Sequence, residues 1–128
     1  MAQDLLLPDQ LKAGARAAGA IAARGAPTLT VAFWFLSRGV WTFAVATPDI
    51  DMRPTQDIHA DIDAAIATLG GVDAFAALGD LILVFAPNDP PAPAAHAALD
   101  APATQTIDGV GCHAALGDVV VYDHRARA

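Results

Sequence analysis

The chain has 128 residues, of which 55% are hydrophobic, and it carries a formal net charge of −7 at pH 7. A chain of this length and hydropathy can bury enough apolar surface to offset its conformational entropy, so we expect one globular domain over residues 1–128. The acidic balance excludes nucleic acid as a partner, because binding to phosphates needs a basic surface.

The N-terminal segment and the single cysteine both indicate a cytoplasmic protein. The first residues, MAQDLLLPDQ, hold too short an apolar run for a secretion signal. Cys112 has no second cysteine to pair with, which excludes an intrachain disulfide and fits a reducing compartment.

The first predicted element is a helix that Asp9 can cap and that Gly25 and Pro27 end. Small and apolar residues recur along it in steps of three and four, at Leu11, Ala15, Ala18 and Ile21. One face of this helix is therefore expected to pack on the core.

Residues 28–47 are nearly uncharged and long enough to span a bilayer as a helix. Arg38 lies at the centre of this stretch, where an arginine costs about 3 kcal/mol in a spanning helix. The surrounding residues are β-branched and aromatic, which favours strands. We therefore predict a β-hairpin with strands at 28–37 and 40–47 joined at Arg38-Gly39, and no membrane segment.

Both faces of the predicted hairpin are apolar. One face holds Trp34, Leu36, Trp41, Phe43 and Val45, and the other holds Leu29, Val31, Phe33, Phe35 and Val40. A sheet with one face in water alternates apolar and polar residues, so the second face needs cover from this chain or from a partner. We expect a protein partner or a second copy of the chain, as in a homodimer, to bind through the aromatic side chains of Trp34, Trp41 and Phe43.

A second helix is predicted from Pro54 to Leu69. Its apolar face holds Ile58, Ile62, Ala65, Ile66 and Leu69. The residues expected to face water are Asp57, His59, Asp61 and Asp63.

The remaining chain is read as short elements. Turns at 72–78 lead to a strand at 81–86, and the loop PNDPPAP leads to a short helix that ends near Asp100. An edge strand at 103–107, a turn at Asp108-Gly109 and a last strand at 119–122 follow. The expected fold is α+β, or α/β, with a mixed sheet of four to five strands, an N-terminal helix, a hairpin and two helix–strand units.

The pentapeptide AALGD occurs twice, at residues 76–80 and 114–118, and an apolar stretch follows each copy. A shift of 38 residues aligns GVDAFAALGDLILVF with GVGCHAALGDVVVYD. A shift of 37 residues aligns HADIDA with HAALDA. We interpret the two segments as copies of one helix, turn and strand unit, although alanine-rich sequence produces such matches easily.

Each AALGD copy is predicted to be a structural corner, in which a helical turn exits through Gly79 or Gly117 in a left-handed conformation. The two strands that follow are then expected to run parallel. The alternative is that Asp80 and Asp118 meet as a carboxylate pair for a metal ion or for acid–base catalysis.

Two histidine–aspartate pairs have the spacing of metal ligands on a helix. They are His59 with Asp63 and His96 with Asp100, each four residues apart. Zinc accepts such ligands, but the same spacing is also typical of surface pairs worth about 0.2–0.5 kcal/mol.

Four short segments resemble a group of small uncharacterised bacterial proteins. They are the apolar strand VAFWFLS, the strand end WTFAVATP, the loop APNDP and the segment DGV. Ala86 replaces a serine of the family's S-P-x-D-P loop, and Asp108 replaces an asparagine of its N-G-V segment. The resemblance implies a small intact domain but no activity, and it transfers no functional residues.

These observations favour a non-catalytic protein-interaction module, such as an inhibitor, an immunity-type protein or an accessory subunit, without a cofactor. The alternative is a metal-dependent hydrolase or metal-binding domain that uses aspartate and histidine. The enzyme interpretation is less favoured because the chain has one serine, one lysine, one tyrosine and no glutamate, and lacks the common nucleotide, hydrolase and zinc motifs. Cys112 and His113 are sequence neighbours that point in different directions, which does not suit a nucleophile and its base.

Overall fold

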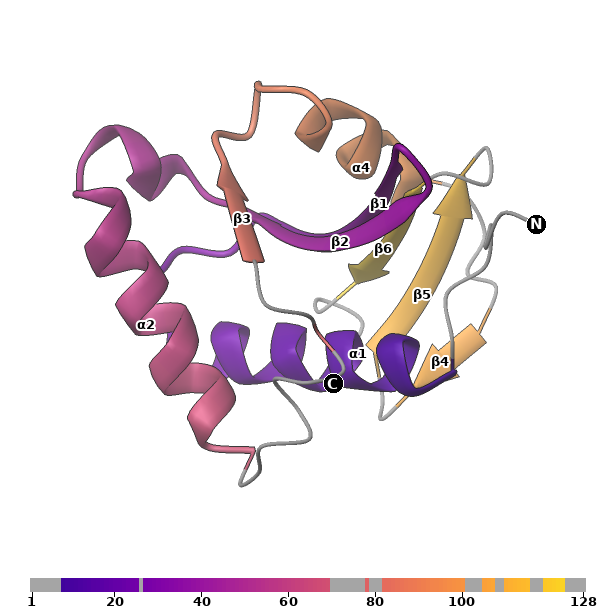
Figure 1. Ribbon diagram of the computed structural model, residues 1–128, viewed down its shortest axis with the longest axis horizontal. Helices are drawn as coiled ribbons and strands as arrows, with labels where there is room; N and C mark the ends of the chain where they lie inside the picture. The colour runs from indigo at the N-terminus through magenta and orange to yellow at the C-terminus, as the bar shows by residue number, and fades with distance from the viewer. Residues whose placement is uncertain are drawn as a thin grey trace.

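The structure is a computed structural model that describes residues 8–25, 27–69, 78, 82–100, 105–107, 110–115 and 119–123. In chain order the elements are α1 (Pro8–Arg24), β1 (Val31–Ser37), β2 (Val40–Ala46), the 3-10 helix η1 (Pro48–Asp51), α2 (Thr55–Ala67), β3 (Ile82–Phe85), α4 (Ala92–Ala98), β4 (Gln105–Ile107), β5 (Val110–Ala115) and β6 (Val119–Asp123). The fold is α+β, as predicted (Figure 1).

The six strands form one mixed sheet in the order β3-β2-β1-β6-β5-β4, which exceeds the expected four to five strands. β3 is parallel to β2, and every other neighbouring pair is antiparallel. These pairings make β3 and β6 run in the same direction, as predicted for the strands that follow the two AALGD copies. The short strand β4 forms one edge, also as predicted.

The hairpin is confirmed, and so is its register. Val31 pairs with Ala46 and Ser37 with Val40, so Arg38 and Gly39 alone form the loop. Both loop residues have positive φ, 54° and 76°, as a two-residue turn of type I′ requires. The apolar stretch 28–47 is therefore a strand pair, and no helix in the described ranges is long and apolar enough to cross a membrane.

The strand β5 corrects the interpretation of the second AALGD copy. Val110–Ala115 is extended and pairs with β4 on one side and β6 on the other, where a helical turn was expected. In the first copy Leu78 is helical, and its counterpart Leu116 lies outside the described residues, so the expected helical turn is contradicted only for Ala114 and Ala115 of the second copy. Hydrogen bonds to two neighbouring strands outweigh the local preference of an alanine-rich segment. Gly79, Gly117, Asp80 and Asp118 lie outside the described residues.

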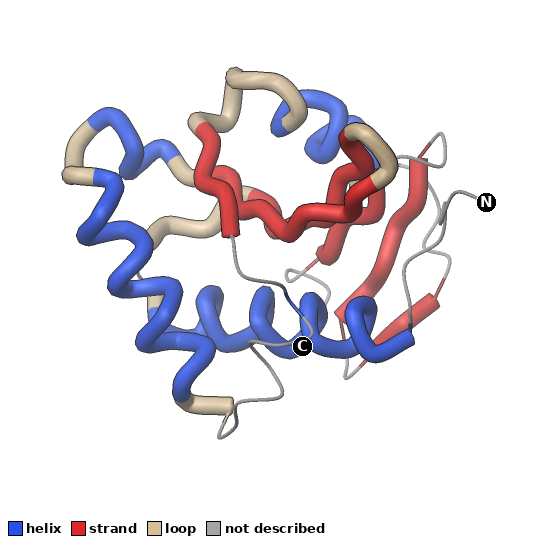
Figure 2. The backbone as a smooth tube through the Cα atoms, viewed as in Figure 1, coloured by secondary structure: helices blue, strands red, loops and turns tan. Residues whose placement is uncertain are grey.

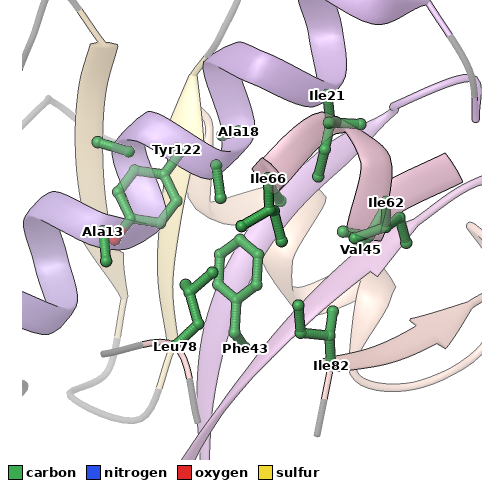
Figure 3. Close-up of a cluster of buried hydrophobic side chains, with 14 of the residues drawn as sticks. Ala13, Ala18, Ile21, Phe43, Val45, Ile62, Ile66, Leu78, Ile82 and Tyr122 are labelled. Carbon is green, nitrogen blue, oxygen red and sulfur yellow. The ribbon is translucent and has the colours of Figure 1, made fainter. Parts of the chain in front are cut away.

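Helices cover both faces of the sheet. Figures 1 and 2 show α1 on one side of the strands and α4 on the other. The first face packs on α1 and α2 through a cluster that includes Ile21, Phe43, Val45, Ile62 and Ile66 (Figure 3). The predicted apolar residues of α2 up to Ile66 are all buried, and Leu69 is half-buried.

The second face packs on α4 through a smaller cluster. Its buried members include Val31, Phe33, Val119 and Val121 from the strands. From α4 the buried members are Ala92, Ala95 and Ala98. Leu29 was predicted on this face, but it precedes β1 and packs against the first cluster instead.

A buried hydrogen-bond chain holds α1 against the sheet. The indole N–H of Trp34 donates to the Tyr122 hydroxyl at 2.9 Å, and that hydroxyl donates to the Leu11 carbonyl at 2.8 Å. Burial raises the pKa of Tyr122 above its ordinary value, so the hydroxyl keeps the proton that it donates. Gly14 makes the close approach of helix and rings possible, because it presents no side chain to them.

An ion cluster connects α1, η1 and α2. The Asp49 carboxylate accepts from the Thr28 backbone N–H at 3.0 Å and lies 3.6 Å from the Arg53 guanidinium. Arg53 also donates to Asp61, and Arg24 of α1 lies 3.5 Å from the same carboxylate. Asp61 was predicted to face water, whereas it links two helices.

We expect Asp61→Asn to destabilise the protein at neutral pH and to lose this effect in acid. The hydrogen bond from Arg53 holds the pKa of Asp61 below its ordinary value of 3.8. A lowered pKa contributes stability above the pKa of the unfolded chain, and that contribution disappears as the pH falls through the folded pKa. Urea unfolding at neutral pH and at about pH 2 measures the difference.

Asp63→Asn removes one exposed carboxylate from the same helix and is the matched control for the change in net charge. An Asp61→Asn deficit that is equally large at both pH values would contradict the role of the Arg53–Asp61 bond.

Candidate functional site

The aromatic residues predicted to bind a partner lie mostly inside the protein. Trp34 is 1% exposed and Phe43 is 0% exposed, because α1 and α2 cover this face of the hairpin. Trp41 is half-buried and packs against the same cluster. The predicted binding surface of Trp34, Trp41 and Phe43 is therefore wrong: the pattern identified an apolar face, and the chain's own helices cover it.

The opposite face carries a second aromatic group at its β2–β3 side. The rings of Phe33, Phe35 and Phe85 lie 5.8–6.3 Å apart, centroid to centroid. Phe33 is fully buried, whereas Phe35, Phe85 and the neighbouring Leu83 are only half-buried. We call Phe35, Leu83 and Phe85 the phenylalanine patch.

The patch is half-exposed because α4 is too short and too small to cover the whole face. α4 has seven residues, packs through alanine side chains, and lies over β6, β1 and β5. Val40 at the hairpin end shares this face through its pairing with Ser37, and it is 60% exposed. The incompletely covered side chains of this face thus include Val40 and the phenylalanine patch, with the half-buried Thr42 following Val40 on β2.

The two predicted metal-binding pairs do not meet. His59 and Asp63 belong to α2, which packs on one face of the sheet. His96 is on α4, which packs on the other face, and Asp100 follows that helix. Among the residues that the structure describes, no three His, Cys, Asp or Glu side chains are placed to hold a metal ion.

The sheet brings together one acid–base pair that sequence reasoning missed. His113 of β5 is 7% exposed, and its Nε2 lies 3.9 Å from Oδ2 of Asp123 on β6. His113 pairs with Val121, so it is on the face of the sheet that α4 covers. The Nε2 atom of His96, a residue of α4, is buried without a hydrogen bond. The two partners are ten residues apart in the sequence, and only the β5–β6 register makes them neighbours.

Cys112 does not complete a catalytic site with this pair. It pairs with Tyr122 and packs in the first cluster, on the opposite side of β5 from His113. Burial raises the pKa of the Cys112 thiol to about 11, so the thiol stays protonated at neutral pH. A buried neutral thiol of this kind is a structural residue.

Comparison with known proteins adds no functional residues. No protein-family model, no curated protein and no solved structure matches the chain. The geometry of the chain's own residues is therefore the basis for any function assigned to it.

Proposed function

We propose that the protein is a non-catalytic protein-interaction module, and that it binds its partner through the phenylalanine patch. The observation that carries this proposal is the half-exposure of Phe35 and Phe85 on a sheet face that α4 leaves partly open. An inhibitor, an immunity-type protein or an accessory subunit acts in this way, by contact alone.

The composition of the phenylalanine patch suits it to bind another protein. Aromatic residues are enriched at the centres of protein interfaces, because they bury a large apolar area at a small cost in side-chain entropy. The patch has no charged side chain, so a partner would not have to desolvate one there. The single cysteine, which suits a reducing compartment, supports a cytoplasmic site of action.

The metal-dependent alternative has no such support. Its candidate ligands are split between two sides of the sheet, with His59 on α2 and His96 on α4. Among the described residues, which do not include Asp80 and Asp118, no group of three or more His, Cys, Asp or Glu side chains is placed to hold a metal ion.

Photo-crosslinking in the native cell tests the proposed surface. Phe35 and Phe85 are each replaced by p-benzoylphenylalanine, which preserves an aromatic ring at a half-exposed site. Gln56, exposed on α2, receives the same group as a control. We expect a discrete protein adduct from positions 35 and 85 after irradiation, and none from position 56.

The absence of an adduct at both patch positions would refute the proposal, as would the same adducts from position 56. The mass of the adduct also identifies the partner class, because a second copy of the chain adds 13.1 kDa.

A further inference from the structure

The strand β3 is the outermost strand at one side of the sheet, and the described strands pair with it only on the β2 side. Figure 1 draws it with no helix crossing it. Its four residues, Ile-Leu-Val-Phe, are all apolar. Monomeric proteins usually protect an edge strand with a charged side chain, a proline or a bulge, and none of these interrupts Ile82–Phe85.

The backbone directions at this edge follow from one hydrogen bond. The Phe85 carbonyl accepts from the Thr47 backbone N–H at 2.9 Å, so Phe85 directs its polar backbone groups toward β2. Successive residues of a strand direct these groups to opposite sides. Val84 therefore presents its N–H and C=O away from β2, on the side where no described strand pairs with β3.

We propose that a second copy of the chain pairs with this edge, antiparallel, about a two-fold axis at Val84. This proposal rests on the proposed function and specifies its partner. In this register Val84 exchanges both backbone hydrogen bonds with Val84 of the second copy. The symmetric pairing extends the two sheets into one.

The strand is self-complementary about Val84. Leu83 lies opposite Phe85 of the second copy, and Ile82 lies opposite Ala86, so every pair is apolar. Leu83 and Phe85 are both on the side of α4, so the two phenylalanine patches become continuous across the axis. Although each chain has a formal charge of −7, the paired strands carry no charged side chain. A self-complementary patch of this kind is what a two-fold dimer requires.

Light scattering on the purified full-length chain measures the first consequence. We expect the wild type to have twice the monomer mass of 13.1 kDa. Val84→Pro should restore the monomer mass with an unchanged circular dichroism spectrum, because the N–H that proline removes points away from β2 and proline is tolerated in edge strands. Val84→Thr keeps that N–H with a side chain of similar shape, and it should remain dimeric.

Cysteine variants test the register. In an antiparallel hydrogen-bonded pair the two Val84 Cα atoms would lie about 5.5 Å apart, within disulfide range, so Val84→Cys should form a disulfide-linked dimer under mild oxidation. The Leu83 positions would be diagonal neighbours about 7–8 Å apart, so Leu83→Cys should link several-fold less. The native Cys112 is buried and does not compete.

A monomeric wild type would overturn the dimer, and so would a Val84→Pro variant that stays dimeric while folded. Equal linking of the two cysteine variants would overturn the proposed register. A monomer that still gives a patch adduct with another protein would overturn the dimer and leave the interaction function standing. A dimer that gives no patch adduct would support the pairing at β3 and contradict partner binding through the phenylalanine patch.

Discussion

Gly14→Ala is expected to lower the free energy of unfolding by about 3 kcal/mol, although alanine is the better helix former. A Cβ atom at position 14 would lie 2.3 Å from the Tyr122 hydroxyl and 2.6 Å from Nε1 of Trp34. Both rings are buried, so α1 must shift away from the sheet. The shift also breaks the hydrogen bond from Tyr122 to the Leu11 carbonyl.

Thermal and urea unfolding measure this effect, and the expected fall in Tm is roughly 10 °C for a domain of this size. Ala23→Gly is the control, because Ala23 is exposed near the end of the same helix and reports helix propensity alone. Ala23→Gly should lower the free energy of unfolding by about 1 kcal/mol or less. If Gly14→Ala were neutral or stabilising, the close packing of α1 on the two rings would be disproved.

Tyr122→Phe is expected to lower the free energy of unfolding by about 2 kcal/mol, although the substitution changes the shape of the side chain little. The hydroxyl accepts a hydrogen bond from the Trp34 indole N–H and donates one to the Leu11 carbonyl, so its loss leaves the buried N–H without this acceptor. An unpaired buried donor loses its bond to water and gains nothing in return. Urea unfolding at neutral pH measures the cost.

A double-mutant cycle with Trp34→Phe isolates the hydrogen bond from the change in ring size. The double variant should be less destabilised than the sum of the single variants by about 1–2 kcal/mol, because each single change already breaks the same bond. Additive effects would show that the Trp34–Tyr122 bond does not contribute.

Local pattern was sufficient to predict the first helix, the hairpin and the second helix. Helical spacing from Leu11 to Ile21 and a stop at Gly25 predicted α1, which ends at Arg24. Arg38-Gly39 predicted a turn, and both residues adopt positive φ there. These elements depend on residues within one or two turns of each other, and such short-range preferences can be read directly from the sequence.

The second AALGD copy shows where local pattern failed. Its alanines resemble those of the first copy, yet Ala114 and Ala115 belong to β5. The residues around them gain backbone hydrogen bonds to β4 and β6, and those neighbours are set by the topology of the whole sheet. Tertiary partners therefore outweigh the helical preference of these two alanines.

The candidate surface could be predicted only in part. The sequence by itself determined that both faces of the hairpin are apolar and that each needs cover, because side chains alternate along a strand. Only the tertiary structure decided that α1 and α2 bury Trp34 and Phe43, and that α4 leaves Phe35 and Phe85 half-exposed. Which helix covers which face depends on packing between segments far apart in the chain, and its free energy comes from shape and area that no local spacing encodes. The same reason applies to the edge at β3 and to the approach of His113 to Asp123, which exist only once the strand order is established.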